Sequence, residues 1–208
     1  MDFYETVETR RTVRDFTGEA IEASILRKIL TAGGNAPSND HLRDLHFIVL
    51  TEKDRIKTVI GKIPKKVSPK RLEFILGSMK LKDPRQRSLY EDAIPKQYQM
   101  LSNAGCLVIP LFRQHTNLLK PRALSSLNAF ASAWCCIENV LLAAAAEKLG
   151  CALRIPSLKE KVHVASVLNI PDDYCMPCYL AIGKPAEDAV YPPQTEWDPD
   201  KMLHFNVW

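Results

Sequence analysis

Glycine is scarce in this sequence, with 8 residues among 208, and its scarcity excludes several common ways of holding a nucleotide. Neither G-x-G-x-x-G nor G-x-x-x-x-G-K-[ST] occurs, which argues against a Rossmann dinucleotide site and against a P-loop. The G-x-S-x-G elbow of many hydrolases is absent as well. If the protein binds a phosphate-bearing ligand, groups other than a glycine-rich loop must hold it.

Signals for metal binding and for export are also missing. There is no H-E-x-x-H motif and no Cys/His cluster at zinc spacing, so we expect no metal site. The opening residues, MDFYETVETR, are charged and amphipathic, unlike a signal peptide. Without a secretory context, the six cysteines are expected to be free thiols in a cytoplasmic protein. Ser132, Glu138 and Asn139 interrupt the longest apolar run, which predicts a buried helix and not a membrane span.

Positive charge is concentrated in one part of the chain. Residues 57–87 contain ten Lys/Arg against two Asp/Glu, so the remainder has 18 positive and 22 negative residues. Two interpretations stay open for this basic insert: a solvated, mobile pair of helices, or a surface that docks an anionic substrate or nucleic acid. Nucleic-acid binding calls for interleaved aromatics or a recognised motif. Neither is present, so nucleic acid is not an expected partner.

Apolar periodicity predicts a single α+β domain over residues 1–208. Helices are expected at 2–9, 21–34, 124–149 and 157–168, and between 52 and 104 we expect further helices and no strand. Strands are expected at 45–51, 106–112, 151–155 and 176–183. The second half of the long helix is apolar nearly all round, which predicts that this helix lies buried at the centre.

The end of the chain has the pattern of a strand. Leu203, Phe205 and Val207 alternate with His204 and Asn206, and side chains of a strand alternate with this period. A lone terminal strand must pair with a sheet edge, either in its own chain or in a partner's.

The segment TRRTVRDF, residues 9–16, is the first candidate for holding a phosphate. In an extended chain Arg10, Thr12 and Arg14 point to one face, and in a helix Arg10 and Arg14 still share one. Two guanidinium groups on one face suit a phosphate monoester. The alternative is an ordinary basic helix terminus.

The loop in NAPSNDHLRDLHFIVL, residues 35–50, is the second candidate. Pro37 and Ser38 end the preceding helix, which leaves Ser38 and Asn39 able to reach the edge of a heteroaromatic ring. His41 and Arg43 alternate toward the same side. The alternative is that these are solvated loop residues, which are common.

Taken together, these two segments resemble the FMN-dependent nitroreductase family. RRTVRDF is similar to that family's RR-[ST]-x-R-x-F segment, and APSNDHLRDLHFIV is similar to its APS loop and first strand. ENVLLAAAAEKLGCALRIP resembles the central helix and the segment over the flavin. NIPDDYCMPCYLAIGKP and LHFNVW resemble the family's last core segment and its aromatic-ended tail. The variable part is about 60–104.

The resemblance implies an α+β nitroreductase-like fold, with a mostly antiparallel sheet flanked by helices. It also implies an intertwined homodimer, with a variable basic helical insert at 57–104 and a tail at 184–208 that embraces the partner and adds a strand to its sheet. Two FMN sites would each use both subunits. The residues expected to bind FMN are Arg10, Arg11, Thr12, Arg14, Pro37, Ser38, Asn39, His41, Arg154, Ile155, Pro156 and Lys184.

Two departures from the family pattern stand out. The commoner loop reads APS-x-x-N-x-Q-P-W, whereas this chain has His41, Arg43, Asp44 and Leu45 at the later positions. The basic pair that often follows GYP is absent, and Lys184 is its candidate replacement. The sequence therefore looks like a divergent subgroup, and it leaves open whether the altered loop supports turnover.

The chemistry implied by the resemblance belongs to the flavin, which takes a hydride from NAD(P)H and passes electrons to a small electrophilic acceptor. Positive charge near the ring stabilises the reduced flavin, and Arg43 and Arg154 are the candidates. A non-catalytic FMN- or ligand-binding dimer, a sensor or store, is the alternative. The acceptor and the choice between NADH and NADPH are not specified, although the basic insert tilts slightly toward NADPH.

The cysteines are mostly expected to be structural. Cys175 and Cys178 form a C-x-x-C spacing, but they enter a predicted strand, where the two side chains would point to opposite faces. Cys135 and Cys136 lie on the long helix, where a free cysteine is a common core residue. The role of Cys151, close to the presumed flavin segment, is left open.

Overall fold

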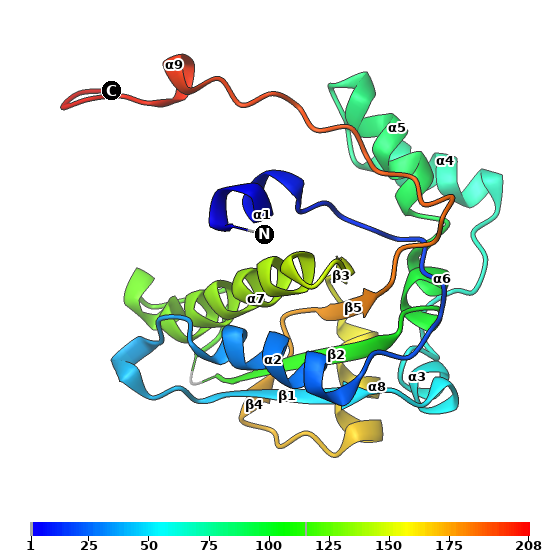
Figure 1. Ribbon diagram of the computed structural model, residues 1–208, viewed down its shortest axis with the longest axis horizontal. Coiled ribbons are helices and arrows are strands. Elements are labelled where there is room, and N and C mark those ends of the chain that lie inside the picture. The colour runs from blue at the N-terminus through cyan, green and yellow to red at the C-terminus, as the bar shows by residue number, and fades with distance from the viewer. Residues whose placement is uncertain (1, 115) are drawn as a thin grey trace.

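The computed structural model describes residues 2–114 and 116–208, and its centre is an antiparallel sheet (Figure 1). The strands are β1 (Leu45–Leu50), β2 (Cys106–Arg113), β3 (Gly150–Arg154), β4 (Tyr174–Cys175) and β5 (Tyr179–Gly183). They are ordered β1-β2-β5-β3, with β4 pairing to the far end of β2. All these pairings are antiparallel, which confirms the predicted sheet.

Helices cover both faces of the sheet, and this explains why β2 and β5 are buried along their length. On one face Val108 and Ile182 pack with α2 (Ala23–Gly34) and α7 (Asn128–Ala146). On the other, Leu107 and Ala181 pack with α3 (Lys53–Val59), α6 (Gln97–Ser102) and α8 (Leu158–Leu168). Neighbours in a strand alternate between two apolar layers, so these strands are continuous hydrophobic runs.

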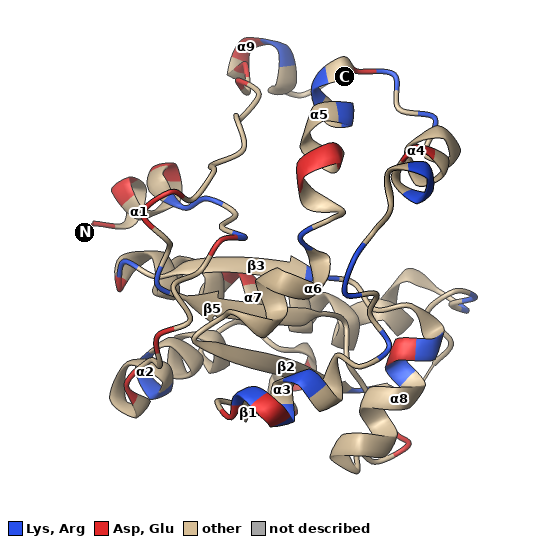
Figure 2. Cartoon of the chain, turned by 90° about the vertical axis from the view of Figure 1, so that its right-hand side faces the viewer, with Lys and Arg blue, Asp and Glu red and all other residues tan. Residues whose placement is uncertain are grey.

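The segment between 52 and 104 is helical, as expected. Besides α3 and α6 it contains α4 (Pro69–Ser78) and α5 (Pro84–Ala93). Helices α4 and α5 each begin with proline, and the residue before the proline caps the helix. The side-chain oxygens of Ser68 and Asp83 accept hydrogen bonds from backbone N–H groups of the first turn. The helices α4 and α5 stand off the same side of the body as α1 (Phe3–Thr9) (Figure 2).

The predicted strand at 176–183 is wrong in its extent. The chain forms β4 at Tyr174–Cys175 and β5 at Tyr179–Gly183, and residues 176–178 belong to neither. Pro177 explains the break, because proline has no N–H to donate to a ladder. Cys175 and Cys178 therefore do not lie on one continuous strand.

The long helix α7 is buried on one side only, which corrects the prediction of central burial. It packs against α2, β2 and β3 and is also contacted by the short helix α1, but Ala131, Cys135, Glu138 and Ala146 are exposed along one stripe. By length and composition, Leu124–Ala146 is the one helix among the described residues that could cross a membrane, and 28% of its most apolar stretch is buried. A single chain does not cover the second apolar side of this helix.

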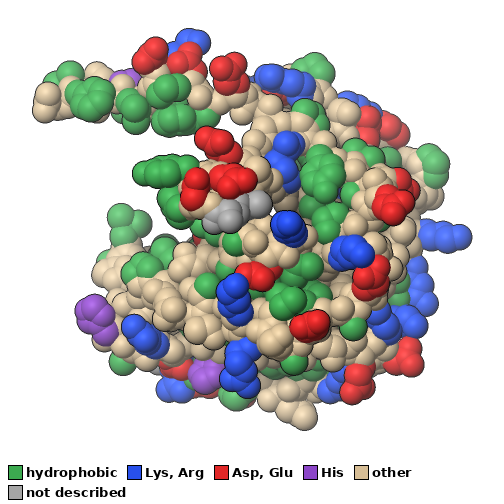
Figure 3. Space-filling model, in the orientation of Figure 1, with side chains coloured by type: hydrophobic (Ala, Val, Ile, Leu, Met, Phe, Trp, Pro, Cys, Tyr) green, Lys and Arg blue, Asp and Glu red, His purple; other side chains and the backbone are tan. Residues whose placement is uncertain are grey.

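The tail leaves the body as an arm (Figures 1 and 3). It contains the short helix α9 (Pro199–Met202), and no strand forms within the chain over 203–208, contrary to the strand period there. Phe205 is 80% exposed and Trp208 is fully exposed. Since these apolar side chains contact little of their own chain, pairing with the chain's own sheet is excluded in this conformation.

Candidate functional site

The arginine segment is extended and lies along the outer edge of β3. The backbone N–H of Val13 donates to the Cys151 carbonyl at 2.9 Å, and Thr12 pairs with Cys151 in an isolated parallel bridge. This close approach depends on Gly150, where a Cβ atom would lie 2.6 Å from the Val13 Cβ. Of the two conformations considered for residues 10–14, the extended one is present.

Replacing Gly150 with alanine is expected to push the arginine segment off β3. The overlap involves the branched Cβ of Val13, which is 3% exposed and has little room to shift. Overpacking of this kind costs about 1–3 kcal/mol. Urea unfolding should show the loss, and Gly34→Ala is the control, because no atom lies within 4 Å of a Cβ placed there. Equal unfolding free energies for the two variants would contradict the proposed contact.

A cavity of about 190 Å³ opens beside the arginine segment. Its lining residues are Thr9, Arg10, Arg11, Val13, Leu141, Ala145, Lys148, Leu149, Gly150, Cys151, Pro185 and Tyr191. Arg10 Nε is 3.9 Å from the Glu138 carboxylate. Among the described residues, no carboxylate forms an ion pair with Arg11, Arg14 or Lys148. The cavity therefore has uncompensated positive charge on its wall and suits an anion.

The structure separates the residues predicted to hold a phosphate into two groups. Arg10 and Arg11 line the cavity, whereas Thr12 and Arg14 belong to the same segment but not to the lining. The Lys184 ammonium is 3.3 Å from Glu19, and its neighbour Pro185 lines the cavity instead. Lys148 was missed in the sequence, although a lysine between the end of the long helix and Gly150 is a usable signal.

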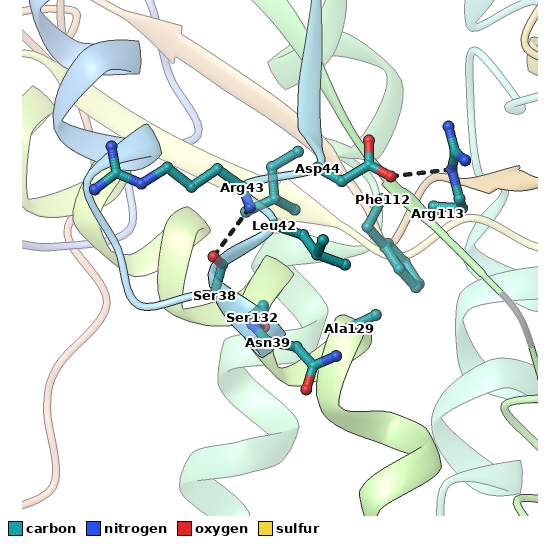
Figure 4. A pocket seen from close by; sticks show the side chains of 10 residues that line it. Ser38, Asn39, Leu42, Arg43, Asp44, Phe112, Arg113, Ala129 and Ser132 are labelled. Carbon is teal, nitrogen blue, oxygen red and sulfur yellow. Dashed lines mark hydrogen bonds and ion pairs between the residues drawn. The ribbon is translucent and has the colours of Figure 1, made fainter.

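The loop after α2 is strained and firmly held. Asp40, His41 and Arg43 have φ values of 52°, 55° and 49°, a left-handed conformation that costs a residue with a side chain roughly 1–2 kcal/mol. The Ser38 hydroxyl accepts a hydrogen bond from the Arg43 N–H at 3.1 Å (Figure 4). The Ser132 hydroxyl on α7 accepts one from the Asn39 N–H at 2.9 Å. Strain of this kind collects at functional sites.

This loop forms one wall of a small cavity of about 60 Å³ (Figure 4). Its lining combines loop residues with the end of β2 and the first turns of α7: Ser38, Asn39, Leu42, Arg43, Asp44, Leu45, Phe112, Arg113, Ala129 and Ser132. Of the residues predicted in this loop, Ser38, Asn39 and Arg43 come together here, whereas Pro37 and His41 are exposed outside the lining.

A polar network at the end of β1 anchors the loop. The Asp44 carboxylate accepts a hydrogen bond from the Tyr174 hydroxyl at 2.7 Å, lies 3.1 Å from His46 Nε2, and pairs with Arg113 Nε at 3.0 Å. Hydrogen bonding from Tyr174 holds the pKa of Asp44 below its usual value, helped by His46 and Arg113. Sequence reasoning missed this network, because Tyr174 is 130 residues away from Asp44.

Asp44→Asn is expected to lower stability by about 1 kcal/mol at neutral pH, since it removes the charge from a partly exposed ion-pair and hydrogen-bond network. The folded pKa of Asp44 is depressed, so its contribution is present above the unfolded pKa and disappears as pH falls through the lower folded value. Urea unfolding of both proteins between pH 7 and pH 3 should therefore show a difference that shrinks at the acid end. A constant difference across that range would refute the assignment.

The two halves of the candidate site lie at opposite ends of α7. Ala129 and Ser132 line the small cavity by the loop, whereas Leu141 and Ala145 line the cavity by the arginine segment. At 1.5 Å of rise per residue, Ala129 and Leu141 are roughly 18 Å apart along the helix. The two cavities share no residue, so within one chain the arginine segment and the loop do not form a common site.

The segment after β3 holds a buried ion pair. The Arg154 guanidinium forms a bidentate ion pair with the Glu160 carboxylate. Its Nη2 donates a hydrogen bond to Oε1 at 2.9 Å, and its Nη1 donates one to Oε2. Glu160 is 5% exposed and also accepts from the Ser157 hydroxyl at 2.9 Å. The charge of Arg154 is thus largely balanced, while Ile155 beside it is 57% exposed. Roles for Arg154, Ile155 and Pro156 at a flavin stay predictions.

Most of the cysteines are expected to be unreactive, because burial raises the pKa of the thiol and disfavours the thiolate. Burial raises the pKa of Cys106 and Cys178 to about 12 and that of Cys136 to about 11. The pKa of Cys151 is raised further by burial, so its side chain is a neutral thiol at physiological pH. Cys135, on the exposed stripe of α7, is solvent-accessible in the single chain.

Comparison with known proteins places this geometry in context. The Nitroreductase family profile matches residues 7–184. An iodotyrosine deiodinase from Nematostella vectensis is 24% identical over 192 residues, which are 92% of this chain and 70% of that protein.

Solved structures share the fold at low identity. A structure of oxidized iodotyrosine deiodinase bound to FMN and 3-iodo-L-tyrosine superimposes with a TM-score of 0.73 and 18% identity, covering 100% of both chains. An FMN-dependent nitroreductase from Clostridium difficile R20291 superimposes with a TM-score of 0.65 and 19% identity, covering 98% of each chain. At this level of identity the structures show a common fold, and the prediction of an α+β nitroreductase-like fold with an antiparallel sheet is confirmed. The intertwined homodimer stays a prediction.

Proposed function

Because this chain belongs to the Nitroreductase family, we propose that it is an FMN-dependent oxidoreductase. It would transfer a hydride from NAD(P)H by way of the flavin to a small electrophilic acceptor. The observation that carries this proposal is the cavity beside the arginine segment, whose wall has the uncompensated charges of Arg11 and Lys148. A phosphate monoester of charge about −2 needs such a wall.

The residues present fit FMN. Arg10, Arg11 and Lys148 would hold the phosphate, and Thr12 would offer its hydroxyl beside them. Gly150 lets this segment lie against β3, which fixes the arginines to a rigid element. When bound, FMN supplies the hydride chemistry, and the protein contributes binding, orientation and charge.

The loop would meet the flavin from the second subunit. Ser38 and Asn39 are fixed by hydrogen bonds to the loop backbone and to α7, so their polar groups are already oriented. Arg43 has no ion pair among the described residues, whereas Arg154 is paired with Glu160. We therefore assign the positive charge that stabilises the reduced flavin to Arg43 first.

Three features support a homodimer. The exposed stripe of α7 consists largely of small and apolar residues, which allow two helices to approach closely. The outer edge of β1 has no partner strand among the described residues. Beside it lies an open groove of about 770 Å³ with apolar residues of α2 and β1 in its wall, Leu26, Leu30, Phe47 and Val49 among them. The alternating tail of a second copy fits such an edge.

Absorption spectroscopy tests the proposed function. The purified protein, or the protein mixed with FMN, should be yellow and should lose its colour anaerobically with NADH or NADPH. A nitroaromatic, a quinone or 3-iodotyrosine, each added alone, should restore the colour, and the fastest of them names the acceptor class. A colourless protein that does not bind added FMN would refute the proposal.

The second candidate function is a flavin-binding dimer without turnover, a sensor or a store. It is favoured by the balanced charge of Arg154 and by a loop with His41 and Arg43 where the family usually has amides. A flavin that binds tightly but is not reduced by NADH or NADPH would select this candidate. The same spectra therefore decide between the two.

A further inference from the structure

Most of the positively charged side chains of the basic insert form no ion pair within the described part of the chain. Three of its ten cations are paired: Lys57 with Asp54, Arg85 with Asp83, and Arg87 with Glu73 and Glu91. The other seven are exposed and form no ion pair within the described part of the chain: Lys62, Lys65, Lys66, Lys70, Arg71, Lys80 and Lys82. We call these seven residues the basic face. Repulsion among these like charges destabilises the folded chain, and an external anionic partner would relieve it.

Contrary to the expectation of no interleaved aromatics, one aromatic side chain lies among the cations of the basic face. Phe74 is 66% exposed on α4, and the Arg71 guanidinium lies over its ring at 5.2 Å from the centroid. Aromatic residues and arginine are the side chains most enriched at the centre of protein interfaces. A purely solvated charged surface gives no reason for an exposed phenylalanine on this helix.

The shape of the insert argues against a small anionic ligand. The cavities at the arginine segment and the loop and the groove along β1 contain no residue of 57–87. Small-molecule sites are concave, whereas the cations of the basic face are spread over α4 and the two loops that flank it, on the part that stands off the body (Figure 2). A charged face that lines none of these cavities suits a macromolecule with complementary charge.

The helical segment 57–104 is anchored to the arginine segment. The Lys96 ammonium, between α5 and α6, lies 2.8 Å from Asp15 and 2.8 Å from Asp92. Asp15 directly follows Arg14 of the arginine segment. A partner docked on the basic face would therefore be held on the side of the molecule where α1 lies, the helix that leads into the arginine segment (Figure 2).

We propose that the basic face docks a small acidic electron-carrier protein that serves as an electron donor to the flavin. This rests on the proposed function and names a second donor besides NAD(P)H. Two reduced carriers would each give up one electron; FMN would take up the two electrons together with protons from solvent, and no bond to the carrier would form. Docking of this kind is weak, steered by charge and sensitive to salt.

The test compares two charge-reversal variants of the full chain loaded with FMN. Lys66→Glu/Lys70→Glu changes the basic face at one loop residue and at the second residue of α4. Lys120→Glu/Lys159→Glu makes the same change at one loop residue and at the second residue of α8. Both pairs are exposed and unpaired, and glutamate in the first turn of a helix is favourable, so both variants should fold.

The probe is a reduced, acidic plant-type [2Fe–2S] ferredoxin, and the readout is the rate of flavin bleaching. In the unaltered protein the rate should fall about tenfold between low and high salt. The Lys66→Glu/Lys70→Glu variant should be about tenfold slower at low salt, the matched variant should be unchanged, and reduction by NADH should be equal in all three proteins.

Several results would overturn this proposal. Equal ferredoxin rates in the two variants would do so, as would a rate independent of salt. A raised KM for NADPH in the Lys66→Glu/Lys70→Glu variant, with NADH unaffected, would assign the face to the 2′-phosphate. Loss of binding to anionic phospholipid vesicles, with ferredoxin rates unchanged, would assign it to a membrane surface. A chain that retains no FMN contradicts both proposals, whereas reduction by NADH without reduction by ferredoxin contradicts only this one.

Discussion

Arg10→Gln/Arg11→Gln should lose FMN almost completely while keeping its fold. Both guanidinium groups line the cavity beside β3, and Arg11 has no ion pair among the described residues. A hydrogen bond to a charged group is worth about 1.5–3 kcal/mol. Removing two such contacts should weaken binding by roughly 100-fold to 10,000-fold, since each 1.4 kcal/mol is a factor of ten.

Titration of FMN by quenching of its fluorescence measures this change. Arg71→Gln/Arg122→Gln is the matched control, because both arginines are exposed and lie outside the cavity. The double substitution in the cavity should not destabilise the protein, since relief of repulsion offsets the loss of the 3.9 Å contact between Arg10 and Glu138. Equal FMN affinity in the two variants would place the phosphate elsewhere.

If the protein is the proposed homodimer, Leu203→Ser/Phe205→Ser/Val207→Ser is expected to convert it into monomers and to release FMN. If the tail of each chain joins the β1 edge of the other, these three side chains point to one face of the added strand. Burying each is worth about 1.5–3 kcal/mol. In the single chain they are 51%, 80% and 77% exposed, so the substitutions should leave the fold of the monomer intact.

Light scattering after size-exclusion chromatography gives the mass, and alkylation of Cys135 gives an independent reading. This cysteine lies on the exposed stripe of α7, so it should react slowly in a dimer and quickly in a monomer. The matched control is His204→Ser/Asn206→Ser, which alters the opposite face of the same strand. If both variants stay dimeric and Cys135 is equally protected, the tail does not hold the dimer together.

The sequence was sufficient for β1, β2, β3 and the main part of β5, whereas β4 was not predicted. The apolar runs of β2 and β5 are long because both faces are covered, and helices α2 and α8 show their period directly. The break at Pro177 was also foreseeable, since a residue without N–H interrupts a ladder. For the candidate site, the extended arginine segment and the loop were both identified from short motifs.

Other features depend on contacts between distant residues, and local patterns do not encode these. Asp44 meets Tyr174 from 130 positions away, and Lys96 meets Asp15 from 81 positions away. The composition of α7 showed that it has two apolar sides. It did not show that its own chain covers just one of them.

The placement of the two cavities at opposite ends of α7 has a genetic consequence. If each flavin site combines the arginine segment of one subunit with the loop of the other, a chain damaged in one part and a chain damaged in the other can restore function together. Neither homodimer would have an intact site, but each mixed dimer would have one. Random mixing of two such inactive chains would recover about a quarter of full activity in a two-fold dimer, so recessive defects in the two halves should complement each other within a single gene.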